Sequence, residues 1–164
     1  MNENVFIALG SNIEPRLHYL KNAIELIGQL DETIINAKSF LYESQPIGNA
    51  TDVFYNAAIR LKTNLSPLTL MKHLLTIEEK LGRVRTIKGG NRIIDCDLLF
   101  FNDAIISSIF LCLPHPEIQN RDFVLRPLKD IDPIFIHPVF KKNVKTLLEE
   151  LALNTSLKQL HFNW

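Results

Sequence analysis

The segment from Ile93 to Phe101 restricts the fold of this chain more than any other. It is apolar throughout except for Asp95 and Asp97. A continuous apolar run is typical of a strand that is buried on both faces, so we expect a central strand of a sheet here. Side chains two residues apart in a strand share one face, with Cα atoms roughly 6.5 Å apart, so the two carboxylates would lie side by side.

Unpaired carboxylates in such a buried strand would each destabilise the fold by several kcal/mol. The pattern therefore favours a cation bound between Asp95 and Asp97. Carboxylate oxygens are hard ligands, so Mg²⁺ is favoured over zinc, and such ions commonly complete their coordination with substrate phosphates. The alternative is an exposed edge strand with two solvated aspartates, because an Asp-x-Asp pattern alone has little specificity.

A basic segment directly precedes this strand. Between residues 80 and 92 the chain carries five basic residues and no acidic one, and three glycines interrupt the segment. The basic residues are Lys80, Arg83, Arg85, Lys88 and Arg92. Arginine binds phosphate oxygens bidentately, so this segment is suited to close over a polyphosphate. A solvated basic loop is the alternative.

The other hydrophobic patterns predict an α+β fold. Strands are expected near residues 5–9, 33–43 and 53–62, in addition to the strand at 93–101. Helical spacing indicates one helix from Pro15 to Gly28 and another from Pro67 to Gly82, the second capped by Ser66. The order βαββαβ is that of a ferredoxin-like fold, with both helices on one face of an antiparallel sheet. A C-terminal extension follows from Ile105, with a short helix near 144–151.

Length and charge exclude several classes of protein. A chain of 164 residues has the size of one domain, so we expect residues 1–164 to form a single domain. Eighteen basic residues balance eighteen acidic ones, so neither nucleic acid nor a membrane is expected as a partner. Cys96 and Cys112 lie in apolar surroundings without CxxC spacing, and the N-terminus lacks the basic region of a signal peptide. We therefore expect buried thiols in a cytoplasmic protein.

Three further places carry candidate binding residues. Glu78 falls on the core-facing stripe of the second helix, where it would orient an arginine or bind a ligand; a surface glutamate is the alternative. His115 is followed by Arg121 and Phe123, which combines a titratable ring, a cation and an aromatic ring; a capping histidine in a turn is the alternative. The segment 44–52, rich in Pro, Gly and Asn, predicts a ligand-shaped loop.

Together these motifs resemble one enzyme family, the 6-hydroxymethyl-7,8-dihydropterin pyrophosphokinases of folate biosynthesis. The resemblance spans roughly residues 5–133 and rests on several segments in the same order and spacing. These are Ala8-Leu9-Gly10-Ser11-Asn12, Phe54-Tyr55-Asn56-Ala57-Ala58, Gly82-Arg83-Val84-Arg85, Arg92-Ile93-Ile94-Asp95-Cys96-Asp97, Pro114-His115-Pro116 and Asn120-Arg121-Asp122-Phe123-Val124-Leu125.

The resemblance implies that ATP gives its β,γ-diphosphate to the hydroxymethyl oxygen of the pterin and leaves as AMP. It implies two Mg²⁺ ions held by Asp95 and Asp97, and a cytoplasmic monomer that acts on these two small molecules. The expected ATP contacts are Glu78, Arg83, Arg85, Arg92, His115 and Arg121, with Arg83 and Arg92 also catalytic. The expected pterin contacts are Ser44, Gln45, Ile47, Phe54, Asn56 and Phe123.

The chain departs from the family pattern in two places. Members often carry a tryptophan and Gly-Pro-Arg in the basic loop, whereas this chain reads Lys88-Gly89-Gly90-Asn91-Arg92 and is one residue shorter. Phe110 and Cys112 stand where polar residues commonly contact the nucleotide. The sequence therefore assigns neither a second stacking partner for the pterin nor the adenine contacts.

Two other functions are compatible with parts of the pattern. Paired aspartates and arginines would also serve a nucleotidyltransferase, which attacks the α-phosphorus and releases pyrophosphate. A ferredoxin-like sheet is also used by RNA-binding modules, but the aspartate-bearing strand, the absence of an RNP1-like pattern and the balanced charge argue against that class.

Overall fold

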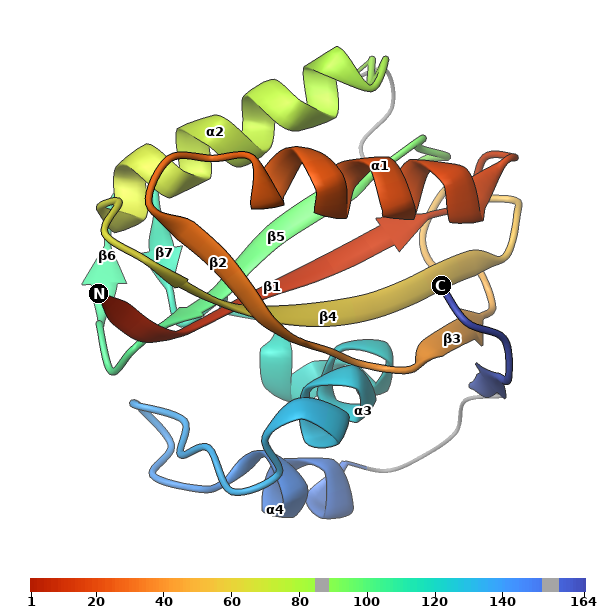
Figure 1. Cartoon of the computed structure of the whole chain (residues 1–164). Helices are drawn as coiled ribbons and strands as arrows, with labels where there is room; N and C mark the ends of the chain where they lie inside the picture. Colours follow the sequence, from red (N-terminus) through yellow and green to blue (C-terminus); the bar gives the residue numbers. More distant parts are fainter. Residues whose placement is uncertain (85–88, 152–156) are drawn as a thin grey trace.

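The computed structural model of the chain describes residues 1–84, 89–151 and 157–164 (Figure 1). Its strands are β1 (Asn2–Ser11), β2 (Thr33–Lys38), β3 (Leu41–Ser44), β4 (Phe54–Thr63), β5 (Asp95–Phe101), β6 (Ile106–Ser107), β7 (Cys112–Leu113) and β8 (Lys158–Leu160). Its helices are α1 (Arg16–Gly28), α2 (Pro67–Lys80), α3 (Asp122–Ile131) and α4 (Val144–Glu150), with a 3₁₀ turn at Ile118–Asn120.

The main sheet is antiparallel, with the order β5-β1-β4-β3-β8, and β2 also pairs with β4. β2 and β3 thus form one interrupted ribbon along β4, where the sequence predicted a single extended segment. The interruption follows a register shift between Ile35 and Ala37. At the break, the hydroxyl of Ser39 accepts a hydrogen bond from the Ala58 N–H (2.9 Å). The predicted βαββαβ order is confirmed, with this ribbon as its second strand.

α1 and α2 cover one face of the sheet, as predicted (Figure 1). Each buries one apolar stripe against the inward side chains of β1, β4 and β5; the buried aliphatic residues are Leu20, Ala23 and Ile27 in α1 and Leu70, Leu74 and Ile77 in α2. Ser66 caps α2, since its side chain accepts a hydrogen bond from the Thr69 N–H. Among the described residues, no helix combines the length and the hydropathy that a membrane span requires.

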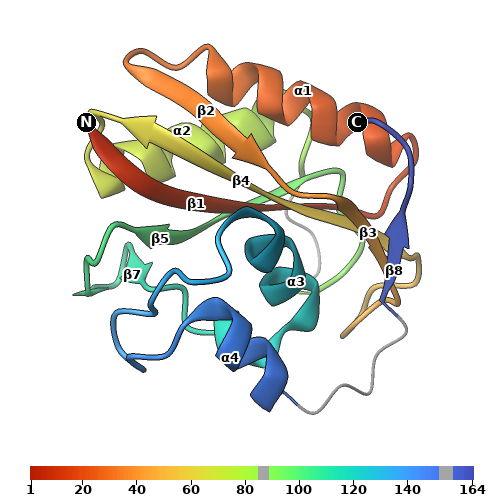
Figure 2. The same cartoon turned by 60° about the horizontal axis from the view of Figure 1, so that its bottom comes forward.

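The C-terminal extension covers the opposite face with α3 and α4, and Figure 2 shows both helices in front of the sheet. The sequence did not predict α3, because Pro127 lies inside it. The helix nevertheless forms, since Val124, Leu125 and Leu128 are buried in a second core with β1 and β5. Residues 57–62 alternate in sequence in a way that predicts one face of the strand toward water, but Ala58 on that face is buried in the second core.

β5 is an edge strand, so its predicted central position is wrong. Its apolar run has another cause, since both faces are covered. Leu98 and Phe101 lie in the core beneath α1 and α2, whereas Leu99 and Phe100 lie in the core beneath α3 and α4. The free edge is partly covered as well, because the His115 N–H donates to the Leu99 carbonyl (2.9 Å).

Candidate active site

Asp95 and Asp97 lie at the start of β5 and share one face of the sheet. Cys96 between them is buried in the core beneath α2, so the two aspartates point to the other face. Their neighbours across the sheet are small, since Gly10 pairs with Asp95 and Ala8 with Asp97. The missing and short side chains on β1 leave space beside the carboxylates.

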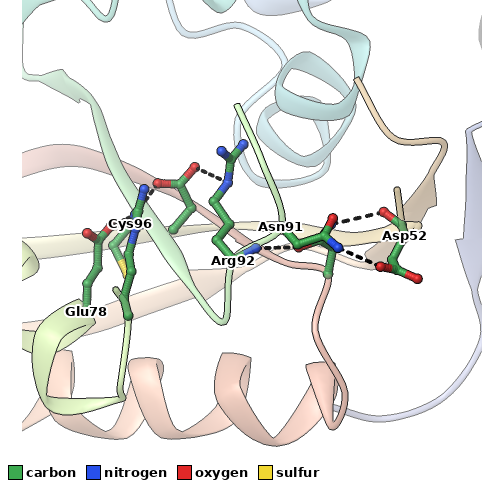
Figure 3. A network of polar contacts seen from close by, with 8 residues as sticks. Asp52, Glu78, Asn91, Arg92 and Cys96 are labelled. Atoms are coloured by element: carbon green, nitrogen blue, oxygen red, sulfur yellow. Dashed lines mark hydrogen bonds and ion pairs between the residues drawn. The ribbon is translucent and has the colours of Figure 1, made fainter. Parts of the chain in front are cut away.

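Arg83 connects Asp95 to the buried Glu78. Its Nη1 lies 2.6 Å from Asp95 Oδ1 and 2.7 Å from Glu78 Oε1. Glu78 Oε1 also accepts a hydrogen bond from the Cys96 N–H (2.7 Å), which fixes the end of α2 to the start of β5. The expectation that Glu78 orients an arginine is therefore met, and Figure 3 shows Glu78 beside Cys96.

Arg92 approaches Asp95 from the other side. Its Nε lies 3.0 Å from Asp95 Oδ2, and its guanidinium carbon lies 5.1 Å from the ring centroid of Phe54. Asp95 therefore pairs with two arginines at once, one on each carboxylate oxygen. The ring of Phe54 adds a cation–π contact that holds Arg92 over the neighbouring cavity.

Asp97 lacks such partners: it makes no hydrogen bond or ion pair with any residue the structure describes. The pKa of Asp97 is raised to about 7, mainly by burial and also by the negative charges of Asp95 and Glu78, while the positive charges of Arg121 and Arg92 act in the opposite direction. A carboxylate in this state favours a bound cation, which would offset the like charges. The described residues contain no group of three or more His, Cys, Asp or Glu side chains placed to hold a metal. Two carboxylates nevertheless suit Mg²⁺, which takes one or two from the protein and further oxygens from water and phosphate.

A cleft of about 780 Å³ opens along α2, the start of β5 and the β6–β7 hairpin. Of the predicted ATP contacts, Glu78, Arg83, Arg92 and His115 line it. Apolar side chains line it as well: Met71 and Leu75 from α2, and Ile109, Phe110 and Leu111 from the hairpin. Arg85, also predicted here, lies outside the described residues, as does Lys88.

His115 is held at the rim of this cleft with a defined orientation. Its Nδ1 accepts a hydrogen bond from the Glu117 N–H (3.3 Å), so in the neutral ring Nε2 carries the proton. Burial lowers the pKa of His115, and the nearby positive charge of Arg121 lowers it too. A neutral ring at pH 7 therefore serves as a hydrogen-bond donor. Both predicted roles, turn cap and site residue, fit this position.

A smaller cavity of about 200 Å³ lies next to the cleft, between β1, β4, the loop after β3 and the start of α3. All six predicted pterin contacts line it: Ser44, Gln45, Ile47, Phe54, Asn56 and Phe123. Asn56 is 5% exposed and donates from Nδ2 to Ser44 Oγ (2.8 Å), so its orientation is fixed. Arg121 lines this cavity and not the larger cleft, with its guanidinium carbon 5.8 Å from the Phe123 ring centroid.

The two cavities meet at the carboxylate pair. Gly89, Arg92, Asp95 and Asp97 line both of them. The larger cleft and the smaller, partly aromatic cavity therefore share a wall that carries two carboxylates and one arginine. This arrangement would suit a transferase that binds one ligand in each cavity, with the carboxylates and Arg92 between them.

The chain belongs to the 7,8-dihydro-6-hydroxymethylpterin-pyrophosphokinase (HPPK) family, whose model matches residues 6–133. The family prediction made from the motifs is confirmed, and the family is one of pyrophosphokinases.

Relatives of known function agree with this assignment. The chain is 35% identical over 154 residues to the 2-amino-4-hydroxy-6-hydroxymethyldihydropteridine pyrophosphokinase of Aquifex aeolicus, covering 91% of this chain and 92% of the relative. The Bacillus subtilis enzyme of the same name is 40% identical over 132 residues, covering 80% of this chain and 79% of the relative.

Longer proteins also match. Folic acid synthesis protein FOL1 of Dictyostelium discoideum is 41% identical over 138 residues, which cover 84% of this chain but 21% of that protein. The chain thus spans about a fifth of the length of this relative. Among solved structures, wild-type Plasmodium falciparum HPPK-DHPS has a TM-score of 0.73 at 18% identity, covering 91% of this chain and 44% of that one. That likeness confirms the fold.

Sequence reasoning missed three features of the site. The apolar side of the cleft gave no separate signal, because Met71 and Leu75 also fit a helix stripe that packs on the core. Asn12 and Asn91, which connect the loops around the site, lie in turns without periodicity. Cys112 was expected to be buried, but it is exposed and lines the cleft, because the short β7 strand turns it away from Leu113 and the core.

Proposed function

We propose that this chain transfers the β,γ-diphosphate of ATP to the hydroxymethyl oxygen of 6-hydroxymethyl-7,8-dihydropterin and releases AMP. ATP would occupy the larger cleft and the pterin the smaller cavity. The observation that carries the proposal is the shared wall, because Asp95, Asp97 and Arg92 line both cavities. A group that crosses from one ligand to the other must pass these residues.

Asp95 and Asp97 would hold two Mg²⁺ ions at this junction. When bound, such ions neutralise charge on the phosphate oxygens and help to align the attacking and leaving oxygens. Asp97 makes no hydrogen bond or ion pair with a described residue, and burial raises its pKa; both features support this role. Asp95 would exchange part of its contact with Arg92 for the cation, which would leave that guanidinium able to turn toward phosphate.

The basic side chains would stabilise charge that develops during the transfer. Arg83 is held in place by Glu78 and Asp95, so its position is set before the substrate binds. Arg92 stands where the two cavities meet, and Arg121 points into the smaller one, so together they would hold the diphosphate as it crosses. His115 would donate from Nε2 to a phosphate oxygen in the cleft.

The smaller cavity fits a flat, polar heterocycle. Phe54 and Phe123 supply aromatic faces, and Asn56 supplies an amide edge whose Nδ2 is already hydrogen-bonded to Ser44. Its Oδ1 would accept from ring N–H or amino groups. Gly10 also lines the cavity, and a Cβ placed there would contact Asn56 Oδ1 (3.6 Å) and Phe54 Cδ1 (3.9 Å). The apolar side of the larger cleft, with Met71, Leu75 and Phe110, would take the adenine.

The products of the reaction provide the test. Purified chain with ATP, Mg²⁺ and the reduced hydroxymethyl pterin should form AMP and the pterin diphosphate, and AMP should not form when any one component is missing. Formation of ADP would indicate single phosphoryl transfer, and release of pyrophosphate would indicate attack at the α-phosphorus. Either product would contradict the proposal.

We further propose that residues 1–164 form one domain that works as a cytoplasmic monomer without nucleic-acid or membrane partners. The two cores on opposite faces of one sheet support a single domain. Sedimentation of the purified chain at several concentrations would test the monomer.

A further inference from the structure

Arg16, the first residue of α1, contacts both chain neighbours of Phe54. Its Nη1 donates a hydrogen bond to the Val53 carbonyl (3.0 Å), and its guanidinium carbon lies 4.2 Å from the ring centroid of Tyr55. α1 and β4 begin at the same end of the sheet (Figure 1), so a side chain from the helix reaches the start of the strand. Arg16 lines neither cavity, so any contribution to them must be indirect.

The start of β4 has little support from its neighbouring strands. β1 pairs with β4 only as far as Ser11, which lies opposite Tyr55. On the other side, β3 ends where it pairs with Phe54. Val53 therefore lies beyond both ladders, and its carbonyl accepts from Arg16 instead of from a strand neighbour. The guanidinium thus replaces the strand contacts that are missing at this point.

Phe54 lies between the two residues that Arg16 contacts. Successive side chains in a strand point to opposite faces, so Tyr55 points toward α1 and Arg16 while Phe54 points into the smaller cavity. The main chain on both sides of Phe54 sets the direction of its Cα–Cβ bond. Holding Val53 and Tyr55 therefore sets the angle at which the ring of Phe54 faces a flat ligand in the cavity.

Local rules disfavour an arginine at this position. The N-terminus of a helix carries a partial positive charge, so a cation in the first turn is unfavourable, and α1 has no acidic residue in that turn. The Arg16 side chain is 15% exposed, and its Nε is buried without a hydrogen-bond partner among the described residues. Glu14 pairs with Nη2 and offsets part of the charge. Residues that break local rules are commonly kept for a function, here the contacts beside Phe54.

We infer that Arg16 is a positioning residue for pterin binding, because it fixes Phe54 in the wall of the smaller cavity without touching the ligand. The inference rests on the proposed function, which assigns the pterin to that cavity. One flat guanidinium stacks on Tyr55 and donates to Val53 at the same time. A lysine ammonium could keep the hydrogen bond but could not lie flat on the ring, so Arg16→Lys should retain only part of the effect.

The experiment is a double-mutant cycle between Arg16 and Phe54. Calorimetry measures the dissociation constant of the reduced hydroxymethyl pterin with saturating Mg²⁺ and α,β-methylene-ATP, a nucleotide whose α–β bridge cannot be cleaved. Arg16→Met should raise this constant about tenfold in the otherwise unaltered chain. In a chain that carries Phe54→Ala, the same substitution should change it by less than about twofold, because the ring that Arg16 positions is absent.

Three further measurements separate positioning from a general loss of structure. The dissociation constant of the nucleotide alone should change far less than that of the pterin in Arg16→Met. In turnover at saturating ATP, this variant should raise the KM for pterin more than it lowers kcat, whereas a smaller folded fraction would lower kcat alone. Arg60→Met is the control, because Arg60 lies on the same strand and lines neither cavity, and it should leave both dissociation constants unchanged.

The outcomes distinguish this inference from the proposed function. If the unaltered chain binds neither ligand and forms no AMP, the proposed function is wrong, and the role of Arg16 with it. If AMP forms, but Arg16→Met binds the pterin as tightly as the unaltered chain, or weakens binding equally with and without Phe54, the inference alone is overturned. Should Arg16→Met not fold, the same cycle with Arg16→Lys decides, with an expected increase of about threefold that disappears in Phe54→Ala.

Discussion

At the start of β5 three carboxylates meet two guanidinium groups, whereas at the β3 edge one carboxylate meets neutral donors. The first group, the β5 cluster, consists of Glu78, Arg83, Arg92, Asp95 and Asp97. The second, the β3 cluster, consists of Asp130 on α3 with Tyr42 and the Phe40 N–H. Asp130 Oδ2 accepts from the Tyr42 hydroxyl (2.9 Å) and from the Phe40 N–H (3.2 Å).

The β3 cluster is complete within the protein, because each described donor has its acceptor. It joins α3 to the sheet, and nothing in it calls for a ligand. The β5 cluster has one more negative than positive side chain, and Asp97 is the member without a described polar partner. Polar groups near a core are therefore informative about function when their charges do not balance, and not simply because they are polar.

The largest expected effect comes from removing the unbalanced charge. Asp97→Asn should lower kcat by about a thousandfold or more, since a carboxylate that holds the cation is lost. The metal-free variant should melt at the same temperature as the unaltered chain or higher, because repulsion within the β5 cluster is relieved. AMP formation and thermal melting without divalent ions measure the two quantities.

Asp103→Asn removes an exposed aspartate just after β5 and is the matched control. It should alter neither turnover nor the melting temperature. Full activity of Asp97→Asn would refute the metal assignment and, with it, the contrast between the clusters.

The second effect concerns stability. Arg83→Met leaves Glu78 and Asp95 without their shared cation and should reduce the free energy of unfolding by about 3 kcal/mol, as when a buried ion pair loses one partner. Arg60→Met is the comparison, because Arg60 pairs with Asp132 at 3.3 Å with both side chains more exposed. That loss should stay below about 1 kcal/mol. Urea unfolding measures both, and equal losses would contradict the special position of the β5 cluster.

The third effect is a pH dependence of stability that comes from Asp97 in the β5 cluster. The pKa of Asp97 is raised to about 7 in the folded chain, above the ordinary value of 3.8, so the folded state binds more protons than the unfolded state between these values. Without divalent ions, the contribution of Asp97 to stability should therefore grow as the pH falls from 7 toward 5. The gain should amount to roughly 2 kcal/mol and be lost again as the pH rises through 7.

Urea titrations at several pH values, with the unaltered chain and Asp97→Asn side by side, isolate this contribution. The two proteins should differ less in the pH dependence of their free energy of unfolding when Mg²⁺ is added, because the cation favours the ionised carboxylate of Asp97. Parallel pH curves for the two proteins would show that Asp97 does not titrate as expected.

The smallest effect tests the β3 cluster. Tyr42→Phe removes the hydroxyl that donates to Asp130 and should reduce the free energy of unfolding by about 1 kcal/mol, the usual net value of one hydrogen bond. Turnover should not change, since Asp130 lines neither cavity. Guanidinium unfolding measures the loss of stability, and AMP formation measures turnover. A marked loss of turnover would mean that the two clusters are coupled.

Local patterns in the sequence predicted much of the fold. The bounds of α1 and α2 follow from apolar spacing, and Ser66 with Pro67 marks the start of α2. The common face of Asp95 and Asp97 follows from the two-residue period of a strand. Residues of the smaller cavity were predicted through the family resemblance, and all six line it.

Other features depended on contacts between distant segments. α3 forms despite Pro127 because its apolar side packs on β1 and β5, which local propensity does not include. The edge position of β5 was missed, since an apolar run reports burial and not the number of neighbouring strands. The hydrogen bonds of Asn91 to Asn12 and Asp52 were missed because contacts between turns have no periodicity in the sequence.

The sequence by itself determined that two carboxylates would lie side by side on a strand next to a basic segment, since strand period and residue order are local properties. The tertiary structure decided which arginines would pair with Asp95, that Asp97 would have no such partner in the described parts of the chain, and that two cavities would meet beside them. These outcomes depend on the antiparallel register that aligns Asp95, Gly10 and Asn56 across β5, β1 and β4. Register is set by long-range packing of the whole sheet, so no local pattern contains it.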